Sequence, residues 1–261
     1  FEHEINKKII TSLKYFLYIK SILLYNYVMD QFKSSWLFAL NNWKYFTALA
    51  LPLIVVESLM GYLIIPLGEM TQPEDFLNFI QSNSAVIAVV GIVALILQIS
   101  FLGGLWISYL SIDKGEIINP FNALQGGLYR FFPIFGAYII VTIASGFGYL
   151  LLIIPGIYLS ARFSLFVPQI IFEENKVLES IGTSWEKTDE HGSKLFMFTL
   201  VFFILIFLTV ITLQSIIPTG ILQTIILAIV EYIFIIPLGY IYFTLYKLSL
   251  IHISEPTRQF R

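Results

Sequence analysis

Residues 85–111 read AVIAVVGIVALILQISFLGGLWISYLS, a run without a charged side chain. A helix of about 20 apolar residues crosses the ~30 Å hydrocarbon core of a bilayer, so this run predicts a transmembrane helix. Five more segments qualify in the same way: residues 44–66, 132–154, 156–172, 195–217 and 221–246. The predicted fold class is an all-α membrane protein with six transmembrane helices.

The composition agrees with membrane insertion and argues against several other classes of protein. Apolar residues make up 57% of the chain and charged residues 12%, whereas a soluble domain carries about 25% charged residues. A net charge of −2 does not support nucleic-acid binding. The chain has no cysteine, which excludes disulfides and thiolate zinc sites.

No enzyme signature is present among the usual short motifs, which include HExxH, the P-loop, GxSxG and GxGxxG. His191 lies in the polar stretch EKTDEHGSK, which is typical of a solvated turn. We therefore expect a protein that is not an enzyme, with no cofactor and no metal, whose partners are membrane lipids.

Positive charges predict the orientation. Outside the fourth segment, the basic residues between Met29 and Lys247 are Lys33, Lys44, Lys114, Arg130, Lys176, Lys187, Lys194 and Lys247. All of them lie on one side of the membrane if the N-terminus is cytoplasmic. The opposite connections, 68–84, the turn near 155 and 218–220, carry no Lys or Arg. The positive-inside rule then predicts a bacterial cytoplasmic (inner) membrane protein with both ends in the cytoplasm.

Three cytoplasmic segments show apolar residues at helical spacing and predict interfacial amphipathic helices. The stripes are Phe32, Trp36, Leu40 and Trp43; Phe121, Leu124, Leu128 and Phe131; and Val177, Leu178, Ile181 and Trp185. Asn119 and Pro120 suit the N-cap and N1 positions of the second helix.

Each predicted interfacial helix precedes a transmembrane hairpin, so the chain reads as three parallel repeats over residues 30–111, 117–172 and 176–247. A 3+3 inverted repeat is the alternative description, because three crossings reverse the direction of the chain.

The two ends differ from the rest of the chain. Residues 1–28 contain no Gly, Ala, Pro or Arg, which favours translated upstream DNA with Met29 as the start; a genuine basic amphipathic leader is the alternative. Residues 248–258 read LSLIHISEPTR and resemble a translated sequencing adapter, so 248–261 is predicted to be an adapter-derived tail. A single six-helix domain over 29–247 remains.

Three ionisable residues lie inside predicted crossings: Glu57 in the first, Arg162 in the fourth and Glu231 in the sixth. A charge near the bilayer centre costs about 2.5–3.5 kcal/mol on insertion scales, and facing a partner inside the bundle lowers this cost. We expect Arg162 to bond to Glu57 or Glu231, or to carbonyl groups freed near a proline. The group is either a buried ion pair that fixes helix register or a ligand or proton site.

The stretch IPGIYLSARFSLFVPQIIFEENKVLESIGTSW, residues 154–185, resembles the YciC-like bacterial inner-membrane proteins and the related glycerophosphoryl diester phosphodiesterase membrane domain. The pattern includes Pro155-Gly156-Ile157, Arg162, Pro168, Glu173 and Ser184-Trp185, and GGLWISYL at 103–110 is also similar. The resemblance implies a six-helix inner-membrane protein. It also makes Arg162 a stronger candidate for a site residue than Glu57 or Glu231, because only Arg162 lies in the matching stretch. It does not imply phosphodiesterase activity, which belongs to a separate soluble barrel in some relatives.

From these observations we expect a polytopic inner-membrane protein with a non-enzymatic envelope or lipid-associated role. A small transporter with an anion or lipid-headgroup site near Arg162 is the alternative.

Overall fold

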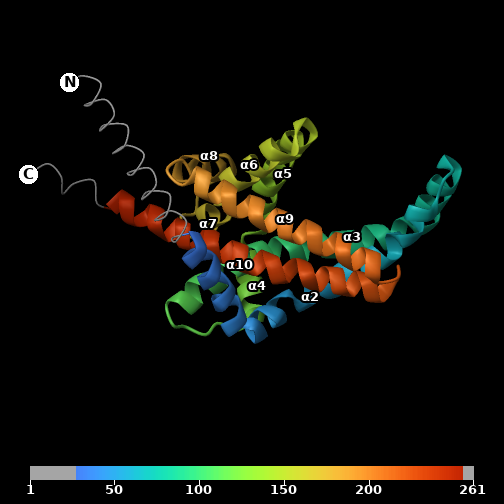
Figure 1. Ribbon diagram of the computed structural model, residues 1–261, viewed down its shortest axis with the longest axis horizontal. Coiled ribbons are helices and arrows are strands. Elements are labelled where there is room, and N and C mark those ends of the chain that lie inside the picture. Colours follow the sequence, from blue (N-terminus) through green and yellow to red (C-terminus); the bar gives the residue numbers. More distant parts are fainter. Residues whose placement is uncertain (1–27, 255–261) are drawn as a thin grey trace, which may run out of the picture.

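The computed structural model describes residues 28–254, and all regular structure in this range is helical (Figure 1). The helices long and apolar enough to cross a membrane are α2 (Trp43–Ile64) with the 3-10 helix η1 (Ile65–Glu69), α3 (Pro73–Asp113), α5 (Phe131–Leu151), α6 (Ile153–Arg162) with α7 (Phe166–Ile171), α9 (Gly192–Ile216) and α10 (Ile221–Ser254). The predicted fold class, with six membrane-crossing segments, is confirmed.

The three shorter helices predicted before the first, third and fifth crossings are also present. They cover residues 28–41, α4 (Pro120–Tyr129) and α8 (Val177–Lys187). The predicted cap of α4 is formed, because Oδ1 of Asn119 accepts a hydrogen bond from the backbone nitrogen of Phe121 at 2.9 Å. Most of the two predicted non-native ends lies outside the described residues.

The second crossing is longer than predicted. Helix α3 has 41 residues and begins at Pro73, twelve residues before the apolar run at 85. At 1.5 Å per residue it is about 60 Å long, twice the hydrocarbon thickness. Pro73 at N1 and the acidic residues Glu74 and Asp75 in the first turn favour this early start. This end of α3 projects beyond the other helices at the right of Figure 1.

The fourth crossing is broken, which corrects the prediction of one continuous helix over 156–172. Helix α6 ends at Arg162, α7 begins at Phe166, and the residues between them form turns. Pro168 explains the break, because a proline has no N–H to donate and its ring clashes with the carbonyl group four residues earlier. A first helical turn, by contrast, tolerates proline, and Pro168 lies in the first turn of α7.

Helices α3 and α4 approach each other through glycines. A Cβ atom added to Gly127 would lie 2.1 Å from the carbonyl oxygen of Ser100, and one added to Gly103 would lie 2.5 Å from Cα of Gly127. No larger residue fits without moving the backbone. The contact attaches α4 firmly to the bundle.

Aromatic rings fill the core between α2, α3 and α10. Tyr109 is fully buried at the centre, and its hydroxyl group donates to the carbonyl oxygen of Ile236 at 2.6 Å. The rings within 6.5 Å of that of Tyr109, measured between centroids, belong to Phe38, Phe46, Trp106, Tyr240 and Phe243. Large apolar side chains on the outer faces of the long helices stay exposed, as expected where lipid is the solvent.

Candidate functional site

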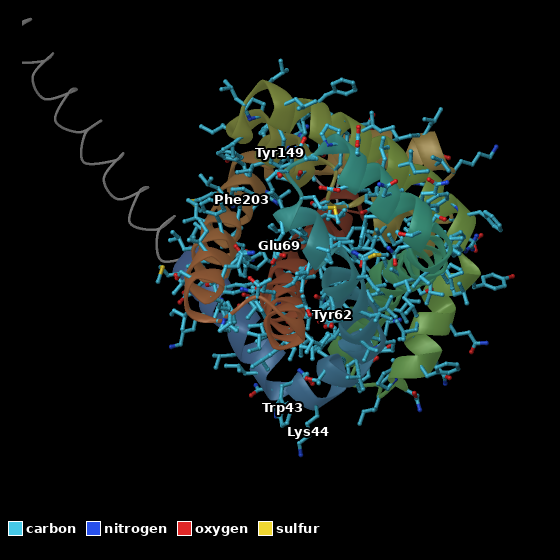
Figure 2. All side chains as sticks on the ribbon, turned by 90° about the vertical axis from the view of Figure 1, so that its right-hand side faces the viewer. Trp43, Lys44, Tyr62, Glu69, Tyr149 and Phe203 are labelled. Atoms are coloured by element: carbon cyan, nitrogen blue, oxygen red, sulfur yellow. The ribbon has the colours of Figure 1, made fainter. Side chains whose placement is uncertain are left out.

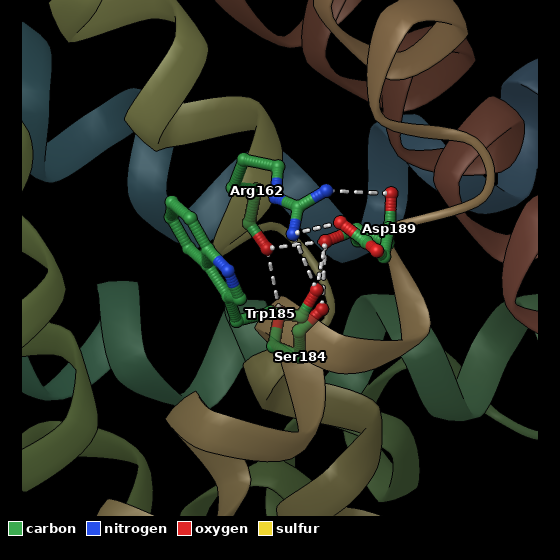
Figure 3. A network of polar contacts seen from close by, with 5 residues as sticks. Arg162, Ser184, Trp185 and Asp189 are labelled. Atoms are coloured by element: carbon green, nitrogen blue, oxygen red, sulfur yellow. Dashed lines mark hydrogen bonds and ion pairs between the residues drawn. The ribbon is translucent and has the colours of Figure 1, made fainter.

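Arg162 is the last residue of α6, and its side chain lies against the end of α8 (Figure 3). The residue is 2% exposed. Nη2 donates to the carbonyl oxygen of Trp185 at 2.8 Å and to Oδ1 of Asp189 at 3.0 Å. Nη1 donates to the carbonyl oxygen of Thr188 at 3.0 Å. The guanidinium group therefore caps the C-terminal end of α8, where carbonyl groups lack partners within the helix.

An aromatic ring and a glycine enclose the same group. Cζ of Arg162 lies 4.3 Å from the centroid of the Trp185 ring, in cation–π geometry. A Cβ atom added to Gly192, the first residue of α9, would lie 2.8 Å from Nη1 of Arg162. The guanidinium group is thus packed between α6, α8 and the start of α9.

Helix α8 in turn provides hydrogen-bond partners for main-chain groups at the break between α6 and α7. The carbonyl oxygen of Arg162 accepts hydrogen bonds from Oγ of Ser184 at 3.0 Å and from Oγ1 of Thr188 at 3.1 Å. Oγ of Ser184 accepts from the backbone nitrogen of Leu165 at 3.1 Å. Buried main-chain groups need such partners. Side chains of α8 therefore bond to the main chain at the break, and Arg162 at the break bonds to the main chain at the end of α8.

The face of α8 that meets the bundle is a row of hydroxyl side chains four residues apart. These are Ser180, Ser184 and Thr188, all fully buried. On the other side, the predicted apolar stripe is partly exposed, since Leu178 is 73% and Trp185 is 38% exposed. Ile181, also in the stripe, packs against the core. The sequence reasoning missed the hydroxyl row, whose signal was the spacing of four.

The structure gives Arg162 a different carboxylate from the one expected. Asp189 is its partner, and the ion pair with Glu57 or Glu231 is not formed. The break explains the difference, because it places Arg162 beside α8 instead of in the middle of a continuous crossing. The carbonyl groups that Arg162 binds belong to a helix end and were not freed by a proline.

The two glutamates lie on neighbouring helices, without Arg162. Oε1 of Glu57, on α2, accepts a hydrogen bond from the hydroxyl group of Tyr232 on α10 at 2.6 Å. Oε2 of Glu57 is buried and has no hydrogen-bond partner within the described residues. Glu231 precedes Tyr232 on α10 and is exposed on the outer surface. The three predicted site residues therefore do not form one site.

A second polar cluster, not foreseen from the sequence, also holds α8. The side chain of Lys187 is 8% exposed, and its Nζ donates to Oε1 of Glu173 at 2.5 Å. The hydroxyl group of Tyr246, on α10, donates to the same oxygen at 2.9 Å. Together with the Arg162 contacts, this cluster fixes both the side and the end of α8.

The cavities lined by described residues include three with volumes of about 240, 470 and 320 Å³. Arg162, Glu57 and Glu231 line none of these three. Within residues 28–254, no three His, Asp or Glu side chains are grouped closely enough to hold a metal ion. The geometry around Arg162 is that of a clamp between helices, with each terminal nitrogen of the guanidinium group bonded to the protein.

Comparisons with protein families, with curated proteins and with solved structures give no match. The resemblance to the YciC-like family stays a prediction, and the interpretation of the site depends on its own geometry.

Proposed function

We propose that this chain is a non-enzymatic, multi-pass protein of a bacterial inner membrane, with both ends in the cytoplasm and a structural, lipid-associated role. The main observation behind the proposal is the burial and hydrogen bonding of the Arg162 side chain. Its guanidinium group is buried and already bonded to two carbonyl groups and a carboxylate. A group so engaged holds helices together. Its Nε has no hydrogen-bond partner within the described residues, but this nitrogen is buried and does not face solvent.

The lateral surface supports a lipid-associated role. Exposed apolar side chains follow the long helices on several sides, and examples are Val55 on α2, Val89 on α3, Phe147 on α5 and Phe207 on α9. The cavity of about 240 Å³ opens between α2 and α10 and is lined almost entirely by apolar side chains. Acyl chains are the natural occupants of such surfaces.

The transporter alternative needs a ligand that replaces a partner of Arg162. Asp189 is the one partner that an anion could displace easily, because its side chain is 79% exposed. The two carbonyl groups cannot leave without opening the end of α8. The two proposals therefore differ in one measurable property, the response of the folded protein to small anions.

Thermal unfolding of the purified chain in one detergent separates the two. We expect added phospholipid to raise the unfolding midpoint and inorganic phosphate at equal ionic strength to leave it unchanged. The Asp189→Asn variant is the sensitive control, because it removes the competing carboxylate. Stabilisation by phosphate in this variant, lost again in Arg162→Lys, would support the anion site and contradict the structural role.

A further inference from the structure

A polar cavity of about 470 Å³ lies where the helix over residues 28–41 meets α2. Residues 41–45 line one side, and Ile112 with residues 115–117 line the other. The first segment contributes the cation Lys44 and the second the anion Glu116. Neither side chain forms an ion pair within the described part of the chain. The lining of the cavity thus carries one charge of each sign, and neither is in a salt bridge; Nζ of Lys44 lies 5.8 Å from the centroid of the Trp43 ring.

An apolar groove adjoins this cavity. Its volume is about 240 Å³, and it runs between α2 and α10, with Ala50, Ile54 and Ile233 among its lining residues. Trp43 lines both the groove and the polar cavity. A molecule that extends past the Trp43 ring, from the polar cavity into the apolar groove, would have its polar end beside Lys44 and its apolar end between α2 and α10.

Trp43 and Lys44 lie at the level of the membrane surface. The first apolar span begins at Trp43, and both side chains lie at the outer edge of the bundle (Figure 2). Tryptophan and lysine are typical of the membrane–water interface. Ile117, beside Glu116, is 96% exposed, as expected for an apolar side chain that faces lipid. Headgroups are therefore at the depth of the polar cavity, and acyl chains are at the depth of the groove.

We propose that the cavity and the groove together bind one phospholipid with a zwitterionic, amine-bearing headgroup of the phosphatidylethanolamine type. The phosphate group is placed at Lys44 and the ammonium group at Glu116, while one acyl chain occupies the groove between α2 and α10. This site deepens the lipid-associated role proposed above and rests on it.

The two charges give the site its selectivity. A phosphatidylglycerol headgroup offers the phosphate to Lys44 but leaves Glu116 without a cation. A phosphatidylcholine headgroup has the cation, but its quaternary nitrogen has no N–H to donate to a carboxylate. Only the amine-bearing headgroup satisfies both side chains. Exposed charge pairs contribute modestly, so we expect a preference of about three- to fivefold over either competitor.

Native mass spectrometry of the full chain, after removal of co-purified lipid, tests the proposal. The probe is an equimolar mixture of phosphatidylethanolamine, phosphatidylglycerol and phosphatidylcholine with matched acyl chains, which are separated by mass. We expect one bound lipid molecule per chain, and we expect phosphatidylethanolamine to be bound in preference to the other two lipids. Glu116→Gln should remove its advantage over phosphatidylcholine, and Lys44→Gln should weaken both phosphatidylethanolamine and phosphatidylglycerol.

Two further variants locate the binding. Lys114→Gln is the matched control, because Lys114 is an exposed lysine of the same connection that lines neither the cavity nor the groove, and it should change nothing. Thr47→Trp places a large side chain at the groove lining and should weaken all three lipids.

Equal binding of the three lipids by the unchanged protein, or a preference that survives Glu116→Gln, would overturn the headgroup site and leave the lipid-associated role intact. If no lipid binds and added lipid does not raise the unfolding midpoint, both proposals fail.

Discussion

Arg162 and Asp189 form an ion pair whose two members have very different surroundings. The side chain of Arg162 is 3% exposed and that of Asp189 is 79% exposed. Removing the aspartate leaves a guanidinium group that keeps two carbonyl partners. Removing the arginine takes the donor from the carbonyl oxygen of Thr188 and leaves that of Trp185 with Oγ1 of Thr188 alone. The two ends of one interaction should therefore contribute very differently to stability.

We predict that Arg162→Ala lowers the free energy of unfolding by about 2–3 kcal/mol, since a buried carbonyl group left without a partner costs about 1–3 kcal/mol and the cation–π contact with Trp185 is lost as well. Asp189→Ala should cost less, because water can replace the exposed carboxylate beside Nη2 and both carbonyl groups keep the arginine as donor. The unfolding midpoints of both variants, measured in one detergent, provide the test. Equal losses would contradict this asymmetric account, and a stable Arg162→Ala protein would remove the structural role of the arginine.

Helix α8 binds the bundle through the hydroxyl groups of Ser180, Ser184 and Thr188. Replacing one of these hydroxyl groups tests whether they hold the helix in place. Oγ1 of Thr188 donates to the carbonyl oxygen of Arg162 at 3.1 Å and is within reach of two carbonyl groups of its own helix. Thr188→Val keeps the shape of the side chain and removes the donor. We predict a loss of about 1–2 kcal/mol in the free energy of unfolding.

Thr183→Val on the same helix is the matched control, because Thr183 is only partly buried. It should stay within about 0.5 kcal/mol of the unchanged protein, as surface substitutions usually do. A Thr183→Val loss as large as that of Thr188→Val would mean that valine disturbs α8 in general, and the hydroxyl row would then not be the cause.

The contact between α3 and α4 yields a second prediction for an element. Gly127→Ala would bring a methyl group against the backbone at Ser100, at a distance of 2.1 Å if nothing moved. Overpacking of this kind costs about 1–3 kcal/mol. Gly146→Ala, on α5, meets nothing within 4 Å and should be neutral or stabilising, because alanine favours helix. The thermal unfolding midpoints of both variants are the measurement. A lower midpoint for Gly127→Ala alone would show that close packing, and not helix propensity, requires glycine at this position.

Hydropathy and charge predict the crossings well because length and apolarity decide whether a helix enters a bilayer. Six crossings and the cap at Asn119 follow from such local rules. The partner of Arg162 does not, because it depends on a break caused by Pro168 and on a hydroxyl row that lies some twenty residues later in the chain. The long start of α3 was missed because polar residues separate Phe76, Leu77 and Ile80 from the continuous apolar run that begins at residue 85.

At the scale of the whole molecule, ion pairs gather where the basic connections meet. Nζ of Lys247, near the end of α10, donates to both carboxylate oxygens of Asp113 at the end of α3. Arg130 pairs with Glu174, and Lys187 with Glu173. These pairs join segments that the charge distribution assigns to one side of the membrane. They agree with the grouping of these segments at one end of the bundle, and they would be the same in either orientation of the protein in the membrane.

The orientation itself can be measured with single cysteines, since the chain has none of its own. Asp75, Lys114 and Glu190 are exposed and suit replacement by cysteine, whereas Lys187 is unsuitable because its side chain is buried in the cluster with Glu173. Asp75 lies in the first turn of α3, about 15 Å of helix before the apolar run at 85, so it clears the bilayer. With both ends in the cytoplasm, a membrane-impermeant maleimide added to intact cells should label Asp75→Cys alone. After the membrane is opened, all three variants should react, which controls for access. Labelling of Lys114→Cys or Glu190→Cys in intact cells would reverse the orientation, and it would also move the proposed lipid headgroup site at Lys44 and Glu116 to the outer leaflet.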